Sequence, residues 1–507
     1  MDKLNEEIRL LIAFLISIFI IFIFSKFQSS KYSQYKNQFQ KTETTQEEEI
    51  IQEGENFEFE NNTYFIKIDK RNGYIKEIGL KKFLRKDEEI FDLNEGTIFF
   101  LNPEFLGGNG FEIERIGNDI LLINQLNRIK ISKRYKIPEN YYIFDYQEKI
   151  LNNTNKDKEF NEFEIEIMKI NIENFKSQRG YVPPKIITGI NRMPIFVDPF
   201  RLKEEKIYKN CRWVGISLRY SLIFVYLPEK SLISLKPDGK FINVKLRCEK
   251  FILKKGEGKK YQFKFYAGPS DYFVARNYIK EDIFGKGFFV VIGRFLFSIL
   301  NGIHKVIPNW GWSIIILTFI IKILFFPLTR KSLYSMKQLQ KLRPYLQDVQ
   351  KKYKDNPYQL QKELMNIYKE YNINPFAGCL PTIIQIPIFI GFFLALRNSI
   401  FLRGASFILW IKDLSMPDTI FVIRGFPINI LPILMTITSY FQQKLTPQTE
   451  PGQKSLTIIM PLIFLFILYN FSSGLLLYWV TMNIGSLIEQ FFVSKNFPKI
   501  HKRQKIC

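Results

Sequence analysis

The chain divides into a long polar stretch and a series of long apolar runs. From about residue 25 to about residue 280 the sequence is charged and polar, and from about residue 288 onward apolar runs recur. One further run, residues 8–24 (IRLLIAFLISIFIIFIF), stands near the start. Apolar runs of about 20 residues are typical of membrane-spanning helices. The pattern predicts a multi-pass α-helical membrane protein with one large polar domain outside the membrane.

The polar stretch has the alternation of β-strands. Residues 57–68 predict a hairpin with Asn61 and Asn62 at its turn. Residues 162–167 alternate strictly between polar and apolar side chains, and residues 261–265 do the same. Many short strands separated by Gly, Asn and Pro turns predict an all-β antiparallel sandwich over residues 56–280.

The apolar runs predict six spans. Residues 8–25 are either a signal peptide or an anchor; the acidic residues before them and the lack of an A-x-A-like site favour an uncleaved anchor. Residues 26–55 lack apolar periodicity and predict a flexible linker. Residues 283–307 are interrupted by charges and predict an amphipathic helix on the membrane surface. The five later spans are expected at about 310–330, 378–397, 427–444, 456–470 and 474–494.

Between the first two of these five spans, apolar residues recur every three or four positions over 331–371 and predict a helical hairpin. Its second helix is expected to begin at Asn356 and Pro357, an N-cap followed by proline at the first helical position.

The net charge of +23 at first suggests a nucleic-acid ligand. Its placement argues against that function. Residues 330–371 hold 10 Lys and Arg against 4 Asp and Glu, and the tail 495–505 holds 5 and none. Basic residues beside apolar runs mark the cytosolic side of a membrane. The charge therefore predicts cytosolic N- and C-termini, a basic cytosolic tail over 496–507, and no specific nucleic acid as partner.

Catalytic and metal-binding patterns are missing from the sequence. It contains four cysteines and two histidines without a CxxC or Cys/His cluster, and no HExxH, G-x-S-x-G or Walker A motif. We therefore expect no enzyme activity, no metal and no cofactor. Cys211 and Cys248 share the polar domain and either pair, if that domain lies outside the cell membrane, or remain free.

Lys322 lies inside the apolar run 310–330. A charged group at a helix centre costs about 2.5–3.5 kcal/mol on insertion scales. A polar cavity, a partner carboxylate or snorkelling toward the cytosolic end of the helix would each accommodate it. Thr318, Gln385 and Asn483 could line such a cavity, or Gln385 and Asn483 could join helices to one another.

Two further sets of residues in the last span also allow two interpretations. Glu489 is the only acid within the last four apolar runs, and its place near the basic end of its helix favours an interfacial or salt-bridge role over that of a substrate ligand. Tyr478 and Trp479 could form an aromatic belt at the outer end of the span.

Several short motifs resemble the YidC membrane protein insertases, the bacterial relatives of the mitochondrial Oxa and chloroplast Albino insertases. They run in register over about 300–495, and two more, in the polar domain, resemble the periplasmic domain of the Gram-negative form. The motifs are Asn309-Trp-Gly-Trp-Ser, Pro327-Leu-Thr329, Asn374-Pro375, Gly378-Cys379-Leu-Pro381, Gln385-Ile-Pro-Ile-Phe389, Trp410-Ile-Lys-Asp-Leu414, Leu431-Pro-Ile-Leu-Met435, Ser473-Gly474, Trp213-Val-Gly-Ile-Ser217 and Phe265-Tyr-Ala-Gly-Pro269.

The resemblance implies an inner-membrane insertase and chaperone. Its five-helix core, over 310–495, would enclose a hydrophilic groove open to cytosol and lipid, and its polar domain would be a periplasmic β-supersandwich. The family has an arginine where this chain has Lys322, so the charge is kept and the bidentate geometry is lost. Thr318, Gln385 and Asn483 would be groove positions, and Ile386, Pro387, Tyr478 and Trp479 would flank the substrate path.

The implied partners are nascent integral membrane proteins and membrane lipids, with the insertase acting alone or with the Sec translocon. The basic tail permits contact with the ribosome. Two other classes of protein remain open from the sequence. A solute transporter would show internal repeats and broken helices, and an assembly factor would use its β domain to bind a carbohydrate or a lipid.

Overall fold

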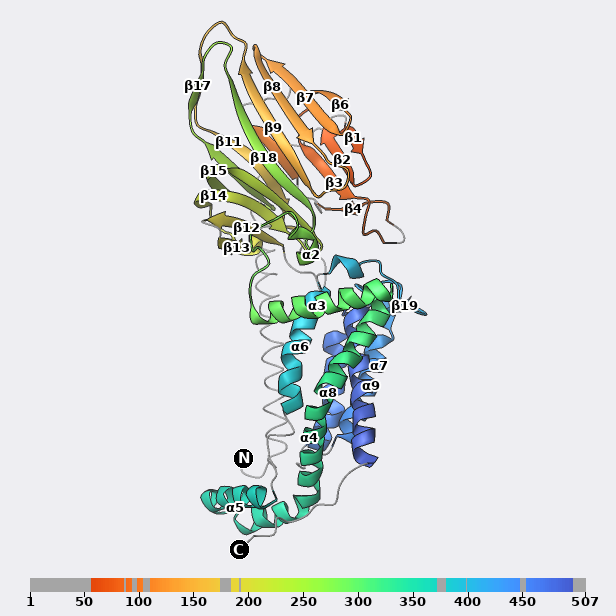
Figure 1. The fold of residues 1–507 in the computed structure, drawn as a ribbon. Coiled ribbons are helices and arrows are strands. Elements are labelled where there is room, and N and C mark those ends of the chain that lie inside the picture. Colours follow the sequence, from red (N-terminus) through yellow and green to blue (C-terminus); the bar gives the residue numbers. More distant parts are fainter. Residues whose placement is uncertain are drawn as a thin grey trace.

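The computed structural model describes residues 56–85, 88–93, 98–103, 110–173, 184–190, 193–371, 380–397, 399–446 and 453–495. The molecule is elongated, with a β domain at one end, a bundle of helices in the middle and helix α5 (Pro357–Glu370) at the far end (Figure 1). The predicted anchor, linker and tail at 8–25, 26–55 and 496–507 lie outside the described residues, as do the motifs at 374–375 and 378–379.

Sixteen strands of the β domain belong to one connected antiparallel sheet. Its main path runs β1-β2-β3-β5-β11-β16-β15-β18-β9-β8-β7-β6, and β4, β12, β13 and β14 join at its sides. The sixteen strands are β1 (Asn56–Glu60), β2 (Tyr64–Asp69), β3 (Ile75–Leu80), β4 (Phe91–Asp92), β5 (Ile98–Pro103), β6 (Glu112–Ile116), β7 (Asp119–Leu126), β8 (Ile129–Lys136), β9 (Ile143–Asn152), β11 (Phe163–Asn171), β12 (Lys185–Ile190), β13 (Met193–Val197), β14 (Lys206–Ser217), β15 (Ser221–Asp238), β16 (Phe241–Cys248) and β18 (Gly258–Pro269). Two smaller sheets pair β10 (Lys158–Phe160) with β17 (Phe251–Leu253), and β19 (Thr419–Ile423) with β20 (Phe426–Asn429).

The strands predicted from alternation are confirmed. β1 and β2 form the expected hairpin, and the Asn61 side chain accepts hydrogen bonds from the backbone N–H groups of Thr63 and Tyr64 at its turn. In β11, Phe163, Ile165 and Ile167 are buried on one face, as the alternation requires. The apolar side chains of these strands form one continuous core.

The thiols of Cys211 and Cys248 do not form a disulfide. Cys211 is buried, and the hydroxyl of Thr188 lies 3.4 Å from its sulfur. Of the two alternatives left open by the sequence, the structure shows two free thiols.

The helical part contains α3 (Phe288–Val306), α4 (Trp310–Lys352), α5, α6 (Leu380–Arg397), α7 (Leu431–Leu445), α8 (Gln453–Leu468) and α9 (Ser473–Lys495), and a short helix α2 (Tyr272–Ala275) precedes them. Two one-turn 3-10 helices cover Pro199–Arg201 and Ile400–Leu402. Among the described residues, three helices are long and apolar enough to cross a membrane, namely Phe288–Val306, Trp310–Lys352 and Ser473–Val493.

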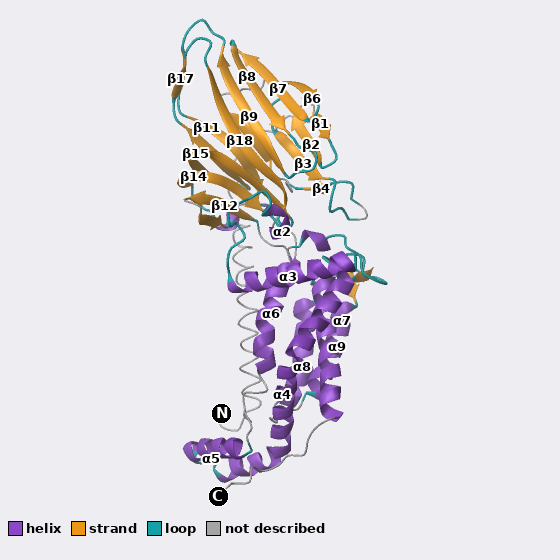
Figure 2. Cartoon of the chain, in the orientation of Figure 1, coloured by secondary structure: helices purple, strands orange, loops and turns teal. Residues whose placement is uncertain are grey.

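Helix α3 runs across the bundle rather than along it (Figures 1 and 2). It crosses α6 at Gly293 and Gly391, where an added Cβ on Gly293 would lie 2.4 Å from the carbonyl oxygen of Gly391. The crossing therefore depends on two residues without side chains.

Two boundaries differ from the sequence-based expectation. The predicted span 310–330 and the first arm of the predicted hairpin 331–371 form one helix, α4, despite Pro327 and Pro344. The span expected at 427–444 begins only at Leu431, because the apolar residues just before it belong to β20. A short apolar run is compatible with strand or helix, and periodicity alone does not separate them. The second arm begins as predicted, with the Asn356 side chain capping α5 through the N–H of Gln359.

Candidate functional site

A cavity of about 140 Å³ lies between α4, α6, α7 and α9, in the half of the bundle away from the β domain. Its wall carries both apolar and polar side chains. The lining residues are Ile321, Lys322, Phe325, Leu328, Thr329, Ser332, Leu333 and Met336 of α4, Ile384, Gln385 and Ile388 of α6, Gln442 and Thr446 at the end of α7, and Met482, Ser486, Glu489 and Gln490 of α9.

At this cavity the side chain of Lys322 reaches from α4 to α9. Its Nζ donates a hydrogen bond to Ser486 Oγ at 2.6 Å and to Glu489 Oε2 at 3.1 Å. The side chains of Lys322 and Glu489 are 11% and 10% exposed. The aliphatic part of Lys322 lies against Gly485, where a Cβ would come within 3.2 Å of Lys322 Cγ. Of the three ways to accommodate the charge, the structure contains two, a partner carboxylate and a polar cavity.

The second oxygen of Glu489 also faces a polar group. Thr329 Oγ1 lies 3.4 Å from Glu489 Oε1, and Gln490 Nε2 donates to Thr446 Oγ1 at 2.9 Å. The polar side of the cavity thus carries two separate sets of hydrogen-bonded groups, one between α4 and α9 and one between α9 and Thr446, the residue directly after α7. A polar peptide segment in the cavity could form hydrogen bonds with these groups, whereas the lipid hydrocarbon would leave its polar groups unpaired.

The four predicted groove residues separate into two pairs. Lys322 and Gln385 both line the cavity. Thr318 is buried and donates to the carbonyl oxygen of Ile314 one turn earlier. Asn483 Nδ2 bonds to Ser439 Oγ at 2.8 Å and to Thr438 Oγ1 at 3.1 Å, which joins α9 to α7. Neither Thr318 nor Asn483 is among the lining residues, and the contacts of Asn483 match the interhelical alternative.

The residues predicted to flank the substrate path lie on α6 and α9. Ile386 is 49% exposed, and Pro387 follows it within α6. Tyr478 is buried against Phe392, with ring centroids 4.8 Å apart. Trp479 meets the ring of Phe389 edge-on at 4.8 Å. Ile386 therefore presents a surface, whereas Tyr478 packs α9 onto α6.

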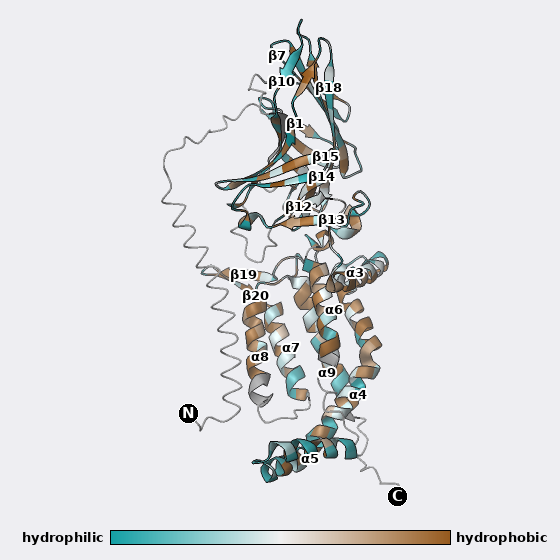
Figure 3. Cartoon of the chain, turned by 90° about the vertical axis from the view of Figure 1, so that its left-hand side faces the viewer, coloured by the Kyte–Doolittle hydropathy of each residue, from teal (hydrophilic) through white to brown (hydrophobic). Residues whose placement is uncertain are grey.

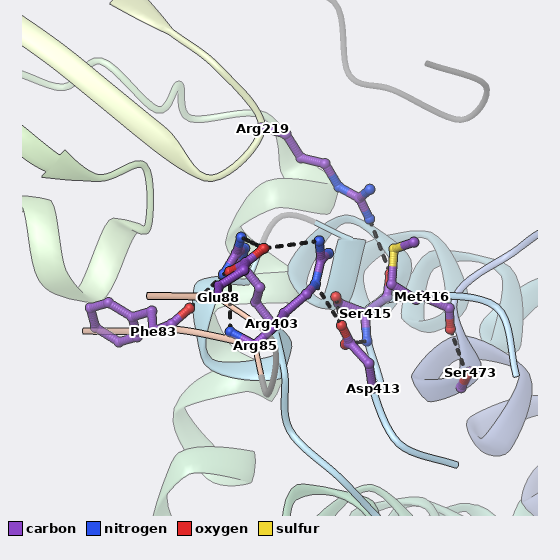
Figure 4. A network of polar contacts seen from close by, with 9 residues as sticks. All are labelled: Phe83, Arg85, Glu88, Arg219, Arg403, Asp413, Ser415, Met416 and Ser473. Carbon is purple, nitrogen blue, oxygen red and sulfur yellow. Dashed lines mark hydrogen bonds and ion pairs between the residues drawn. The ribbon is translucent and has the colours of Figure 1, made fainter. Parts of the chain in front are cut away.

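The opposite end of the bundle is covered by a network of polar contacts with the β domain (Figure 4). Arg403 donates to both oxygens of Glu88, at 2.6 and 2.7 Å, and to the carbonyl oxygen of Phe83 at 2.6 Å. Arg85 Nε donates to Asp413 Oδ2 at 2.9 Å. Burial alone would raise the pKa of Glu88, but the hydrogen bonds from Arg403 and from the Arg85 backbone outweigh burial and lower that pKa.

The loop between α6 and β19 carries the helix-bundle side of this junction, and it is also tied to α9. Ser473 Oγ donates to the carbonyl oxygen of Met416 at 2.5 Å, and the Gly474 N–H donates to that of Leu414 at 2.9 Å. Gly404 has φ +70°, and an added Cβ would come within 2.8 Å of the Leu84 carbonyl oxygen. The end of the bundle next to the β domain is therefore closely packed, and the described cavity lies at the other end.

Ser486 and the cavity role of Glu489 were not predicted from the sequence. The two residues are three positions apart on α9 and so share one helix face. That spacing, together with Lys322, is the sequence signal that could have pointed to them. Their pairing with α4 is a tertiary contact, which spacing within one helix does not show.

Within the described ranges, no three His, Cys, Asp or Glu side chains gather as metal ligands would.

Comparisons of this sequence with a family model and with known proteins agree with one another. A sequence model of the family described as "60Kd inner membrane protein" matches residues 302–501. The chain is 42% identical over 293 residues to the membrane protein insertase YidC of Endomicrobium trichonymphae, with 56% of each chain covered. It is 37% identical over 301 residues to that of Pelobacter propionicus, with 57% of this chain and 56% of the relative covered. The chain spans about half the length of these curated relatives.

Solved structures show weaker similarity. A crystal structure titled an active YidC insertase with the first transmembrane domain resolved covers 88% of this chain and 93% of its own, at 17% identity and a TM-score of 0.39. A galactose mutarotase-like protein from Lactobacillus casei covers 42% of this chain and 100% of its own, at 10% identity and a TM-score of 0.32.

Proposed function

Because the chain belongs to the family of the YidC membrane protein insertases, we propose that it inserts integral proteins into the bacterial inner membrane and helps them fold. The observation that carries this proposal is the polar cavity around Lys322 and Glu489, within a bundle whose other end is closely packed. Such a cavity offers hydrogen-bonding groups at a depth where lipid offers none.

The proposed architecture has six spans. They are the anchor 8–25 and a five-helix core over 310–495, with α3 on the membrane surface outside and the hairpin 331–371 in the cytosol. The β domain would then be a periplasmic supersandwich, and both termini would be cytoplasmic. The orientation of α3 across the bundle and the basic charge of 330–371 support this arrangement.

In the proposed mechanism, a carboxylate in the acidic tail of the client replaces Glu489 as the ion-pair partner of the Lys322 ammonium. The cavity does not offer a free cation, because Glu489 already neutralises Lys322. Exchange keeps the charge compensated throughout, which avoids the large cost of leaving a buried charge unpaired. A carboxylate of the client could also accept a hydrogen bond from Ser486 if that hydroxyl turns away from the Met482 carbonyl oxygen, to which it donates at 3.0 Å.

The client helix would then leave sideways past α6. The exposed side chain of Ile386 gives that face an apolar surface, and burial of the client's own apolar side chains in lipid drives the release. The step breaks no covalent bond, so the proposal needs no cofactor and no catalytic residue.

We propose the Sec translocon as a second partner for large clients and the ribosome as a contact of the basic tail. Both proposals rest on the family and on charge, and the cavity itself would serve small clients without them.

Reconstitution tests the proposed function directly. The purified chain is placed in lipid vesicles, and a small single-span client with an acidic tail is added with protease. We expect a several-fold larger protected fraction than in vesicles without the chain. A matched client with a neutral tail should gain less, because it cannot exchange with Glu489. Equal protection with and without the chain would overturn the proposal.

A further inference from the structure

A small apolar hairpin projects from the outer end of the helix bundle. It consists of β19 and β20, joined by Arg424 and Gly425. Both turn residues have positive φ, 48° and 81°, which is the conformation of a tight two-residue hairpin turn. In Figures 1 and 3 the hairpin stands to the side of the bundle, near the level of α3.

The hairpin is apolar on both faces, which is unusual for a ribbon in water. All five residues of β19 are exposed, among them Phe421 (51%), Val422 (61%) and Ile423 (53%), and Phe426 of β20 is 57% exposed. A strand with one buried face alternates between apolar and polar side chains. A lone two-stranded hairpin is also only marginally stable in water. These side chains therefore require an apolar surrounding beyond the part of the chain that the structure describes.

The base of the hairpin is firmly held by Tyr469, the residue directly after α8. Asn429 Nδ2 donates to the Tyr469 carbonyl oxygen at 2.8 Å, and Tyr469 Oη donates to that of Pro427 at 2.8 Å. The rings of Phe426 and Tyr469 lie 5.3 Å apart. The hairpin is thus a fixed projection of the bundle.

The exposed apolar surface continues from the hairpin onto the neighbouring helices. Phe466 and Ile467 at the end of α8 are 84% and 60% exposed, and Ile433 near the start of α7 is 41% exposed. Helices of a membrane bundle present such residues to lipid. The same lipid phase that covers the helices would cover the hairpin.

Charge at the hairpin favours lipid over a protein partner. Residues 419–429 contain one charged residue, Arg424 at the tip. Asp418, next to the hairpin, is buried and accepts hydrogen bonds from Trp410 Nε1 and from the N–H groups of Ile430 and Leu431. A cation beside a ring of apolar side chains fits the boundary where lipid phosphates meet the acyl chains.

We propose that the hairpin 419–429 docks into the outer leaflet of the bilayer at this boundary, with its apolar side chains among the upper acyl carbons and Arg424 toward lipid phosphates. The depth follows from the backbone, because the outer edges of a two-stranded ribbon carry N–H and C=O groups that cannot enter the hydrocarbon core unpaired. The hairpin would fix the level of the bundle in the membrane. This inference rests on the proposed orientation in the membrane but not on insertion activity.

Depth-dependent fluorescence quenching tests the proposal. The four cysteines are replaced by serine, Val422→Cys is labelled with an environment-sensitive fluorophore, and the chain is reconstituted in vesicles of phosphatidylethanolamine and phosphatidylglycerol. Nitroxide lipids carry the quencher at the headgroup, high on the acyl chain or near the bilayer midplane. We expect the two shallow quenchers to exceed the deep one by about twofold or more.

Ile252→Cys provides the matched control, because Ile252 is 60% exposed but lies on β17 in the β domain. It should show no quenching by any nitroxide lipid. A label at residue 422 that behaves like the one at 252 would overturn the proposal. So would a label that nitroxide lipids do not quench and that aqueous iodide does not reach, since a protein surface would then cover the hairpin.

Arg424→Glu in the Val422→Cys background tests the phosphate contact. We expect shallow quenching to fall in vesicles with phosphatidylglycerol, by about twofold, because the reversed charge is repelled from an anionic surface. Unchanged quenching in those vesicles would overturn the role of Arg424.

Discussion

Arg403 at the junction with the β domain and Lys322 in the cavity are both nearly buried cations with a carboxylate partner. Arg403 makes three short bonds to the β domain, two to Glu88 and one to the Phe83 backbone, within closely packed loops. Lys322 makes two bonds, and its carboxylate partner faces an open cavity. The planar guanidinium suits a fixed, bidentate contact, whereas an ammonium can exchange one partner for another. The site beside the β domain (the outer site) therefore holds two domains together, and the site in the cavity (the inner site) is the one at which we propose partner exchange.

Reversing the inner charge should have the largest effect. Lys322→Glu places two carboxylates against each other in the cavity wall. Removing one partner of a buried ion pair already lowers the stability of a folded protein by about 3–5 kcal/mol, because the other charge stays buried without compensation. We expect insertion of acidic-tailed clients into vesicles to fall by about tenfold or more, since every 1.4 kcal/mol is tenfold.

The double variant Lys322→Glu with Glu489→Lys separates folding from function, because it restores a pair across the same helices. It should recover the melting temperature of the bundle. If Lys322→Glu folds and inserts all clients as well as the original chain, the exchange mechanism is wrong.

Breaking the outer contact should reduce stability and leave insertion nearly unchanged. Arg403→Gln removes the bidentate bond to Glu88, and Glu88 is partly exposed, so we expect a loss of about 1–3 kcal/mol. Thermal unfolding in detergent measures it. Arg201→Gln is the matched control, because Arg201 is 81% exposed and pairs only with Asp198 among the described contacts; its effect should stay within about 0.5 kcal/mol. A tenfold loss of insertion by Arg403→Gln would contradict the claim that Arg403 affects only stability and Lys322 affects insertion.

Removing the inner carboxylate should sharpen client preference. Glu489→Gln keeps the shape of the side chain and frees Lys322 for the client. The preference for acidic over neutral client tails should rise about threefold, because a tail no longer displaces a competing carboxylate. Competition between two labelled clients in one vesicle sample gives the ratio. A fall in that preference would mean that Glu489 serves only to hold Lys322 in place.

Acidic pH should weaken the outer junction by the smallest amount. The pKa of Glu88 is lowered in the folded chain, so its stabilising contribution is present at neutral pH and is lost as the pH falls below about 4.5 and through the folded value. The melting temperature should therefore decrease over that range by more in the original chain than in Glu88→Gln. Identical pH profiles would show that Glu88 adds no stability.

The fold followed from the sequence where local signals and burial agree. The hairpin of β1 and β2 has both strict alternation and turn residues, and α5 has an N-cap followed by proline, so both were predicted correctly. The hairpin 419–429 was missed, because its strands lack alternation and adjoin an apolar helix. A prediction based on hydrophobicity alone takes its apolar residues as the start of a membrane span.

The site was predicted only in part for a similar reason. Lys322 stands out as a charge in an apolar run, and Gln385 joins it in the cavity wall. Asn483 is equally polar, but it faces α7, and the direction of a side chain on a helix depends on how the helices are rotated against each other. Glu489 could be identified as a salt-bridge candidate, but its partner became known only from the packing of α4 against α9.

We propose that clients pass the cavity around Lys322 and Glu489 during insertion. A photo-crosslinking amino acid placed at Gln385, in the cavity, reports contact with a client held during insertion, and the same probe at Phe196, 46% exposed in the β domain, is the control. On this proposal, we expect strong cross-links from position 385 to the polar tail of the client and none from position 196. Cross-links from both positions alike, or none from position 385 while insertion proceeds, would contradict it.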